Sequence, residues 1–303
     1  METKSVFVTI AGRANAGKSS LLNKLIGEKI AMVTEKPQTT RTKITGVLTE
    51  GEIQYVFIDT PGIQIAKNKL GEHMNRAVQE SVTGIDAIIY VADVTKKIND
   101  IDRNAIEGFK GGRTPVILLI NKIDLLDDKG AAAERIAEFS ELMDFHSVIP
   151  VSVSENDGLD ILKEEVRKLA VPSPHYFPEE SVTDQPEKVI MSEIIREKVM
   201  ILMHDEIPHG IAVTIEHLDE SVTRSGEDIL NISATIFCER DSHKGMVIGK
   251  GGAMLKKIGA MAREELEEFF RIRVNLQLWV KVKEDWRNRE GLIRNFGLSN
   301  NTK

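Results

Sequence analysis

Residues Gly12 to Ser19 form a glycine-rich stretch that carries side chains suited to phosphate chemistry. They read glycine, four residues, Gly-Lys-Ser, with an apolar run before them and an amphipathic run after them. Glycines let successive backbone N–H groups point toward one position, where the positive end of the next helix adds to the potential. We expect Lys18 to reach the β and γ phosphates of a nucleotide and the Ser19 hydroxyl to reach a magnesium ion. The alternative is an ordinary glycine turn.

An aspartate ends the second strand pattern that follows this stretch. The strand expected over Glu52 to Asp59 runs into Asp59-Thr60-Pro61-Gly62. A carboxylate at the carboxyl end of a core strand suits a magnesium-linked acid, and the N–H of Gly62 can then face the γ phosphate. The alternative is a strand that ends in a plain Asp-Thr-Pro-Gly turn.

A third polar cluster, Asn-Lys-Ile-Asp, ends the buried strand expected over Thr114 to Asn121. A purine with an exocyclic amine presents adjacent N–H donors, which an ionised carboxylate accepts in pairs, so Asp124 predicts guanine rather than adenine. We expect Asn121 to tie loops together and Lys122 to pack its stem over the base. Taken alone this tetrapeptide is a common capping turn, and its place after a strand gives it weight. Residues Ser152 to Ser154 form a loop whose backbone amides could touch a base carbonyl, which is a weak signal.

Strand and helix patterns alternate through the first part of the chain. This alternation predicts parallel strands, whose carboxyl ends bring these loops to one edge of the sheet. An α/β domain with a mainly parallel sheet and helices on both faces is the expected fold. A polar, exposed loop is expected from Glu35 to Thr42. The expected strands lie near 6–10, 43–49, 52–59, 87–93, 114–121 and 148–151, and the expected helices near 21–26, 69–82, 131–143 and 158–169.

The segment Val171 to Pro186 interrupts the alternation with four prolines and no apolar period, which predicts a linker. A smaller α+β domain is expected beyond it, with the order α, β, β, α, α, β. Its helix patterns include 189–203 and 254–270, and its strand patterns are 211–217, 229–238 and 274–282. Between two of its helices lies Gly249-Lys-Gly-Gly252, a loop that could approach a sugar-phosphate backbone closely, or that could be a flexible turn.

Composition and charge narrow the class of protein. The 303 residues are 41% apolar and 29% charged, as in globular proteins, and the net charge is −7. Residues 240–303, however, hold 14 Lys+Arg against 8 Asp+Glu, which suggests a binding face for an anion or simply a solvated surface. The single cysteine, Cys238, excludes an intramolecular disulfide, and the sequence shows no signal peptide or membrane-spanning run. We expect a cytoplasmic protein.

Several other residues are expected to be structural. The seven histidines show no metal-ligand spacing, although His243 lies near the basic loop. Cys238 is expected to be a reduced, partly buried thiol and Trp279 to be a core residue. Core packing is also expected for Met200, Met203, Met254 and Met261.

These motifs, in this order, resemble known families. The first part is similar to GTPase domains of the translation-factor-related class, and the second is similar to a KH domain. The stretches that carry the first likeness are Gly12–Ser19, Thr39-Thr40, Asp59–Gly62, Asn121–Asp124 and Ser152–Ser154. The pair resembles the bacterial Era GTPase family through Glu193–Lys198, Glu206–His209, Val247–Gly252, Leu278–Lys283 and Asp285–Arg287.

The resemblance implies a GTP-hydrolysing switch that binds the 3′ end of 16S ribosomal RNA and assists maturation of the small (30S) ribosomal subunit. It implies a GTPase domain over 1–172, a linker over 173–187 and a KH domain with a tail over 188–303. It further implies a monomer, with some peripheral membrane association on the inner face of the cell membrane. Val153 departs from the alanine common in the family. One rival function is a plain RNA-binding protein whose nucleotide site is only structural. The other is a small-molecule kinase, and the base-reading motif Asn121–Asp124 argues against the kinase.

The expected roles of the site residues follow from the motifs and the resemblance. Lys18, Thr40, Gly62 and Asn15 are expected to serve hydrolysis, and Ser19, Thr40 and Asp59 to hold Mg²⁺. Ile63 stands where Ras-like enzymes carry a water-orienting glutamine. Asn15 resembles the asparagine of potassium-activated GTPases, which implies K⁺ as a further ion; the alternative is that Asn15 only favours the loop's backbone geometry. The expected nucleotide contacts are Gly12, Arg13, Ala14, Asn15, Ala16, Gly17, Lys18, Ser19, Ser20, Asp59, Thr60, Pro61, Gly62, Asn121, Lys122, Ile123, Asp124, Ser152, Val153 and Ser154. The expected RNA contacts are Ile248, Gly249, Lys250, Gly251, Gly252, Lys256 and Lys257.

Overall fold

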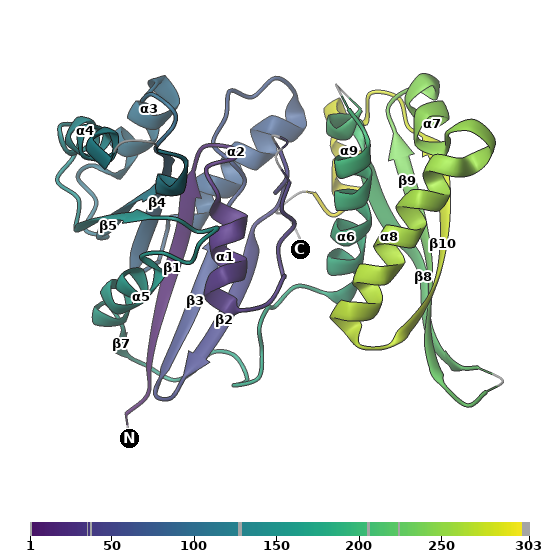
Figure 1. Ribbon diagram of the computed structural model, residues 1–303, viewed down its shortest axis with the longest axis horizontal. Coiled ribbons are helices and arrows are strands. Elements are labelled where there is room, and N and C mark those ends of the chain that lie inside the picture. The colour runs from purple at the N-terminus through teal and green to yellow at the C-terminus, as the bar shows by residue number, and fades with distance from the viewer. Residues whose placement is uncertain are drawn as a thin grey trace. The chain divides into compact units, whose positions relative to one another are not determined.

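The computed structural model describes residues 2–34, 36, 38–126, 129–204, 207–223 and 225–298. The chain forms two compact units, one built mainly from the residues up to Asp184 and the other mainly from Gln185 onward. In Figure 1 the first unit runs from purple to teal and the second from green to yellow. Among the described residues, no helix is long and apolar enough to cross a membrane.

The first unit contains a mainly parallel sheet, as the sequence predicts. Its strands are β1 (Lys4–Gly12), β2 (Ile44–Glu50), β3 (Ile53–Asp59), β4 (Ala87–Asp93), β5 (Val116–Asn121), β6 (Ser147–Val151) and β7 (Val171–Pro172). The order across the sheet is β2-β3-β1-β4-β5-β6, with β7 paired to β1. Two of these strands are antiparallel to their neighbours: β2 pairs with β3, and β7 pairs with β1. The parallel strands therefore end at one edge of the sheet, where the predicted loops follow.

Helices cover both faces of this sheet, which confirms the predicted α/β class. They are α1 (Lys18–Ile26), α2 (Lys69–Ser81), α3 (Asp100–Phe109), α4 (Lys129–Ser140) and α5 (Leu159–Lys168). Leucines of α1 and α5 belong to the core on one face, whereas Ile106 of α3 and Phe139 of α4 belong to the core on the other. Strand β5 is buried on both faces, which explains its unbroken apolar sequence.

Helix α3 is not predicted from the sequence, which indicates no element between Asp93 and Thr114. The helix begins with a reciprocal cap. The Asn99 side chain accepts hydrogen bonds from the backbone N–H groups of Ile101 and Asp102, and the Asp102 carboxylate accepts one from the N–H of Asn99. This capping box satisfies N–H groups that the helix cannot pair internally, and it stabilises the first turn of the helix.

The segment expected as a linker packs along the first unit, which extends past the predicted boundary at Pro172 to Asp184. The buried side chain of Gln54 is central to this contact. Its amide nitrogen donates to the carbonyl of Phe177 at 2.9 Å, and its oxygen accepts from the N–H groups of Tyr176 and Phe177. Further along, the N–H of Val47 donates to the carbonyl of Val182. The prolines rule out helix here, but the extended chain finds hydrogen-bond partners on the domain.

The polar loop before β2 is less exposed than predicted. Glu35 and Pro37 lie outside the described residues. The side chains of Thr40 and Arg41, however, are only 6% and 3% exposed, so the prediction of an exposed loop is wrong there. Thr40 is buried because its hydroxyl is hydrogen-bonded within the site described below.

The second unit is smaller and has the predicted order of helices and strands. Its elements are α6 (Glu187–Leu202), β8 (Ala212–Val222), β9 (Asp228–Cys238), α7 (Asp241–Ile248), α8 (Ala253–Phe270), β10 (Arg273–Val282) and a short α9 (Glu290–Asn295). The three strands lie in the order β10-β9-β8, with β9 antiparallel to β8 and parallel to β10. Apolar side chains of α6 and α8 pack on this sheet.

One prediction about the core of this unit is wrong. Trp279 on β10 is 46% exposed, whereas Trp286, for which the sequence analysis makes no prediction of burial, is fully buried. Side chains alternate along a strand, and Trp279 falls on the face opposite Leu278. Trp286 instead donates its indole N–H to the carbonyl of Gly210 and packs edge-on against Phe296. Cys238 is a free, buried thiol, and Met200 and Met203 are core residues as expected.

Candidate functional site

The phosphate-binding loop joins β1 to α1 and depends on two glycines. Gly12 has φ +145°, and a Cβ there would lie 2.3 Å from the backbone oxygen of Val91. Gly17 has φ +102°, and its Cβ would lie 2.3 Å from the amide nitrogen of Asn121. No L side chain fits at either position, because the loop passes directly against its neighbours. The tight path turns the loop backbone inward, as phosphate binding requires.

Lys18 begins α1 and is 5% exposed. Its ammonium donates a hydrogen bond of 3.0 Å to the carbonyl of Arg13, at the start of the same loop. Burial lowers the pKa of Lys18, and the charge of Asp59 partly opposes that shift. A buried cation at the opening of a helix is placed to stabilise polyphosphate charge.

Ser19, Thr40 and Asp59 form a cluster of oxygen atoms beside Lys18. The Ser19 hydroxyl donates to Oδ2 of Asp59 at 2.6 Å and lies 2.8 Å from the Thr40 hydroxyl. Burial raises the pKa of Asp59, against the opposing effects of Lys18 and of hydrogen bonds from both hydroxyls. The second carboxylate oxygen, Oδ1, is buried without a hydrogen-bond partner in the described structure. Two hydroxyls and a carboxylate with one unsatisfied oxygen are a donor set that fits a hard divalent cation.

Gly62 packs directly against the phosphate-binding loop. A Cβ at Gly62 would lie 2.6 Å from the Cα of Ala14, and the N–H of Ile63 donates to the carbonyl of Gly12. Thr60 is tied to β1 through the carbonyl of Ile10. The loop after β3 is therefore held against the loop after β1.

The base-reading residues meet at the ends of β5 and β6. Asn121 donates its amide N–H to the carbonyl of Ala16 at 2.9 Å and accepts from the N–H of Val153 at 3.1 Å, so it joins three loops. Asp124 is exposed and accepts from the Ser152 hydroxyl, which also lies 3.0 Å from the hydroxyl of Ser154. Val153 is 3% exposed, so it contributes its backbone while its side chain packs in the core.

Lys122 makes contacts that sequence reasoning does not predict. Its ammonium lies 2.9 Å from the carbonyl of Asn15 and 2.7 Å from the carboxylate of Asp93 at the end of β4. Burial would raise the pKa of Asp93, but the hydrogen bonds from Lys122 and Thr95 outweigh it and lower the pKa. Ile123, also expected at the nucleotide, packs instead against the core beneath α4.

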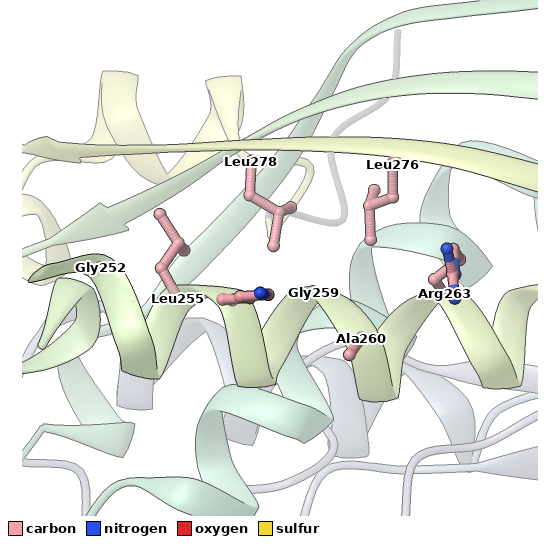
Figure 2. Close-up of a pocket in the computed structure, with 8 residues that line it drawn as sticks. Gly252, Leu255, Gly259, Ala260, Arg263, Leu276 and Leu278 are labelled. Carbon is pink, nitrogen blue, oxygen red and sulfur yellow. The ribbon is translucent and has the colours of Figure 1, made fainter.

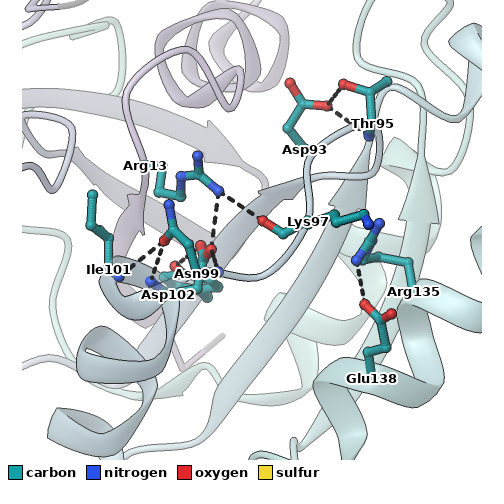
Figure 3. A network of polar contacts seen from close by, with 10 residues as sticks. Arg13, Asp93, Thr95, Lys97, Asn99, Ile101, Asp102, Arg135 and Glu138 are labelled. Carbon is teal, nitrogen blue, oxygen red and sulfur yellow. Dashed lines mark hydrogen bonds and ion pairs between the residues drawn. The ribbon is translucent and has the colours of Figure 1, made fainter.

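Arg13 is placed differently from the other predicted nucleotide contacts. Its guanidinium donates to the carbonyl of Lys97 and pairs with the Asp102 carboxylate of α3 at 3.1 Å (Figure 3). The sequence places the arginine at the nucleotide because of its position in the motif, and it gives no sign of α3, which holds the partner.

In the second unit, the predicted Gly-Lys-Gly-Gly loop joins α7 to α8. Gly249, Gly251 and Gly252 all have positive φ, at 71°, 59° and 81°. A Cβ at Gly249 would lie 2.7 Å from the Cβ of Met254, whereas one at Gly251 or Gly252 would meet nothing within 4 Å. Lys250 and Gly251 are exposed. The loop is open on its outer side, so a backbone could approach it.

A groove of about 520 Å³ continues from this loop between α8 and β10. Figure 2 shows leucines from both elements projecting into it, with Arg263 near one end. The lining residues are Gly252, Leu255, Lys256, Gly259, Ala260, Arg263, Leu276 and Leu278. Among the predicted RNA contacts the groove therefore includes Gly252 and Lys256, but not Lys257.

Sequence reasoning misses most of the groove. On α8 a signal is available, because Gly259, Ala260 and Arg263 follow Lys256 at spacings of three, four and seven, which puts them on one helix face. No comparable signal marks Leu276 and Leu278, since alternating leucines in a strand also predict core packing.

Comparisons with known proteins agree with both sites. A family model described as "50S ribosome-binding GTPase" matches residues 7–122, and one described as "KH domain" matches residues 206–287. The chain is 47% identical to the GTPase Era of Clostridioides difficile, covering 98% of this chain and 99% of that protein. It is 44% identical to the GTPase Era of Ruminiclostridium cellulolyticum, covering 99% of each chain.

Two solved structures are similar over nearly the whole chain. One is a crystal structure of Era in complex with MgGDPNP and nucleotides 1506–1542 of 16S ribosomal RNA, with a TM-score of 0.93, 35% identity, and coverage of 98% of this chain and 99% of that chain. The other is a single-substitution variant of Aquifex aeolicus Era bound to GDP and AlF4⁻, also with a TM-score of 0.93 and 35% identity, covering 98% of this chain and all of that chain.

Fold and site together define a P-loop GTPase joined to a KH RNA-binding domain. The enzyme hydrolyses GTP to GDP and phosphate. Within that class, the chain belongs to the Era GTPase family.

Proposed function

We propose that the protein is a GTP-controlled switch that binds the 3′ end of 16S ribosomal RNA and assists maturation of the small ribosomal subunit. The observation that carries this proposal is the open glycine loop beside the groove between α8 and β10. It is supported by the similarity to an Era structure that contains MgGDPNP and an RNA of that region.

In this proposal Ser19, Thr40 and Asp59 hold Mg²⁺ next to the phosphates. The unsatisfied Oδ1 of Asp59 and the two neighbouring hydroxyls fit the ion. When bound, Mg²⁺ neutralises charge that develops on the phosphate oxygens. Lys18 stabilises the same charge, and the N–H of Gly62 senses the γ phosphate.

Asp124 selects guanine by accepting hydrogen bonds from its ring and amine N–H groups. The hydrogen bond from Ser152 holds this carboxylate in place. Asn121 joins the loop after β5 to the phosphate-binding loop through the carbonyl of Ala16. Backbone amides from Ser152 to Ser154 are available for the base carbonyl.

RNA binding in this proposal uses Lys250, Lys256 and Arg263 for the phosphates and the leucine-lined floor for the bases. A groove of mixed polarity suits a single strand, because its phosphates need cations while its unstacked bases need apolar contacts. The experiment is to titrate the protein with a 3′ fragment of 16S ribosomal RNA and a scrambled RNA of equal length, at matched salt. Equal affinity for the two would contradict the assignment.

The rival functions predict different results in one assay. GTP turnover is measured with and without the RNA fragment and with small-molecule phosphate acceptors. A switch releases phosphate at a rate that responds to RNA, a plain RNA-binding protein does not turn over GTP, and a kinase transfers phosphate to an acceptor. The family membership given above argues against the last two.

Two associations expected from the resemblance stay predictions. Peripheral membrane association is tested by flotation with liposomes that contain anionic lipid, and a monomeric state is tested by sedimentation. Co-sedimentation with 30S subunits, with and without a GTP analogue, tests the proposed assembly role.

A further inference from the structure

Arg13 is part of the phosphate-binding loop, yet its side chain is bonded to Lys97, just before α3, and to Asp102 in the first turn of α3. Figure 3 shows the guanidinium directed at Lys97 and Asp102, and the donor distances are 3.2 Å to the Lys97 carbonyl and 3.1 Å to the carboxylate. Both hydrogen bonds leave the same nitrogen, Nη1, and the two acceptors together fix the position of this end of the guanidinium and anchor it.

The anchor's partner, Asp102, is itself rigidly held. It is 3% exposed, and its oxygens accept hydrogen bonds from the Tyr90 hydroxyl at 2.8 Å and the backbone N–H of Asn99 at 3.0 Å, besides the pair with Arg13. Burial, together with the charge of Asp102, raises the pKa of Tyr90, so the Tyr90 hydroxyl keeps its proton and donates. A buried carboxylate with three donors is a fixed point in the fold.

The backbone of Arg13 connects this fixed point to the phosphate site. Its carbonyl accepts the hydrogen bond from the ammonium of Lys18 at 3.0 Å, and it also accepts a weaker one from the N–H of Ala16 at 3.3 Å. The same residue therefore binds Asp102 with its side chain and orients Lys18 with its main chain.

A cavity of about 140 Å³ lies between Arg13 to Ala16 on one side and Asp93, Lys96, Asp102 and Phe139 on the other. Because of this cavity, the part of the loop from Arg13 to Ala16 lacks close packing on one side, whereas Gly12 and Gly17 on either side of it are tightly packed. Polar anchors must then restrain the loop, of which the Arg13–Asp102 pair is one and the contact of Lys122 with Asn15 is another.

We propose that Asp102 is a positioning residue for GTP hydrolysis, acting on Lys18 through Arg13. This inference rests on the role proposed above for Lys18. Charge stabilisation in a transition state depends on the placement of donors more strictly than ground-state binding does, because the charge builds up at specific oxygens. Loss of the anchor therefore slows the chemical step while the flexible, still charged Lys18 keeps binding GTP.

The test compares Asp102→Asn, Arg13→Gln and the double variant with the parent protein in single-turnover hydrolysis at saturating GTP. Each single variant is expected to lose about tenfold in the hydrolysis rate, with the GTP Kd changed by less than about threefold. The double variant is expected to be no slower than the slower single variant, since both remove the same connection. Arg13→Lys, which keeps the cation, is expected to retain an intermediate rate.

Asn99→Ala is the matched control. It removes the other half of the cap of α3 and lowers the thermal midpoint, but it leaves the Asp102 contact with Arg13 in place. Its hydrolysis rate is expected to equal that of the parent. Unchanged rates in Asp102→Asn and Arg13→Gln, additive losses in the double variant, or an equal loss in Asn99→Ala would each overturn the proposal.

Two measures keep the outcome clear. If Asp102→Asn does not fold, Arg13→Gln alone decides, because the side chain of Arg13 is 29% exposed and the buried Asp102 carboxylate keeps its hydrogen bonds from Tyr90 and from the N–H of Asn99. Lys18→Ala is measured in parallel. A fully active Lys18→Ala removes the proposed role of the lysine itself, whereas an inactive Lys18→Ala beside a fully active Arg13→Gln removes only the inference about Asp102.

Discussion

The protein uses two glycine loops, one in each unit, and they need glycine for different reasons. At Gly12, Gly17 and Gly62 a Cβ would lie 2.3 to 2.6 Å from atoms of the protein itself. At Gly251 and Gly252 a Cβ would meet nothing within 4 Å, and only the positive φ favours glycine. The first loop is packed by its own fold. Of the three glycines in the second loop only Gly249 is packed, since a Cβ there would lie 2.7 Å from Met254, and the part at Gly251 and Gly252 faces open space.

This difference indicates how each loop meets its ligand. The packed loop is already shaped before a nucleotide arrives, since a neighbouring backbone or side chain fixes each turn. The open loop leaves room for the backbone of another molecule, and Lys250 stands exposed beside that room. Substitutions in the first loop should therefore lower the stability of the fold, whereas substitutions in the second should lower the affinity for its ligand.

The largest effect is expected for Gly12→Ala set against Gly251→Ala. Gly12→Ala combines a backbone clash with a left-handed conformation and should cost about 4 kcal/mol in free energy of unfolding, whereas Gly251→Ala should cost about 1 kcal/mol from conformation alone. Both tryptophans, Trp279 and Trp286, lie in the second unit, so their fluorescence follows that unit, GTP binding follows the first, and circular dichroism reports the helices and strands of both. Denaturant unfolding with these probes measures both costs. Equal losses in the two variants would remove the contrast between the loops.

The second prediction concerns the base. Asp124→Asn replaces a charged acceptor for two donors and should weaken GTP binding by about 3 kcal/mol, at roughly 1.5 kcal/mol for each charge-assisted bond. Xanthosine triphosphate, with a carbonyl in place of the amine, should bind the variant better than it binds the parent. Competition binding against a fluorescent GDP analogue measures both affinities, and RNA binding serves as the control because Asp124 lies outside the groove. Unchanged GTP affinity would refute the assignment.

The third prediction separates the two loops by function. The double change Lys250→Asp with Gly251→Asp places two anions where phosphate must approach, so RNA affinity should fall about a hundredfold at matched salt. Aspartate tolerates the left-handed conformation at position 251, so the fold should persist. Basal GTP hydrolysis, measured without RNA, should equal that of the parent. Retained RNA affinity would show that the loop is only a turn.

The smallest effect is expected from the choice of monovalent cation. Asn15 has φ +63° in the packed loop, and the side chain of Ile63 has no polar atom to orient water. We expect hydrolysis a few-fold faster in potassium than in sodium at equal ionic strength, because an oxygen of Asn15 can contribute to a K⁺ site and supply the positive charge that an arginine finger gives elsewhere.

In Asn15→Ala the difference between the salts should disappear while GTP affinity stays within about tenfold. A stopped-flow phosphate assay in the two salts measures the ratio. Identical parent rates would discard the potassium site and leave Asn15 as a residue that only favours the loop conformation.

The motifs can be predicted from sequence because their chemistry is local. Gly12 to Ser19 and Asn121 to Asp124 each follow an apolar strand, and a parallel sheet brings such ends to one edge whatever the details of packing. The fold class could be predicted for a similar reason, because a chain in which strands and helices alternate can form few sheet topologies.

Features that depend on distant partners could not be predicted. Arg13 has a polar motif around it, and only the fold shows that Asp102 lies within reach. Thr40 is grouped with Ser19 and Asp59 by the resemblance, but its burial is not predicted, because its loop sequence is polar and its hydrogen-bond partners lie on two other elements. Likewise, Trp279 and Trp286 differ in burial because strand register and the packing of the last helix decide it.

The strip of chain from Ser173 to Asp184 affects how the protein can be divided for study. It is bonded to β1, β2 and β3 through at least five backbone or side-chain hydrogen bonds, and Tyr176 packs edge-on against Phe7 at 5.1 Å. A fragment cut at Pro172 would remove the three hydrogen bonds that the Gln54 amide makes with Tyr176 and Phe177, each worth about 0.5–1.5 kcal/mol, together with the ring contact to Phe7. A fragment that ends at Asp184 keeps them, so an independently folding GTPase module includes the strip that sequence reasoning assigns to the linker.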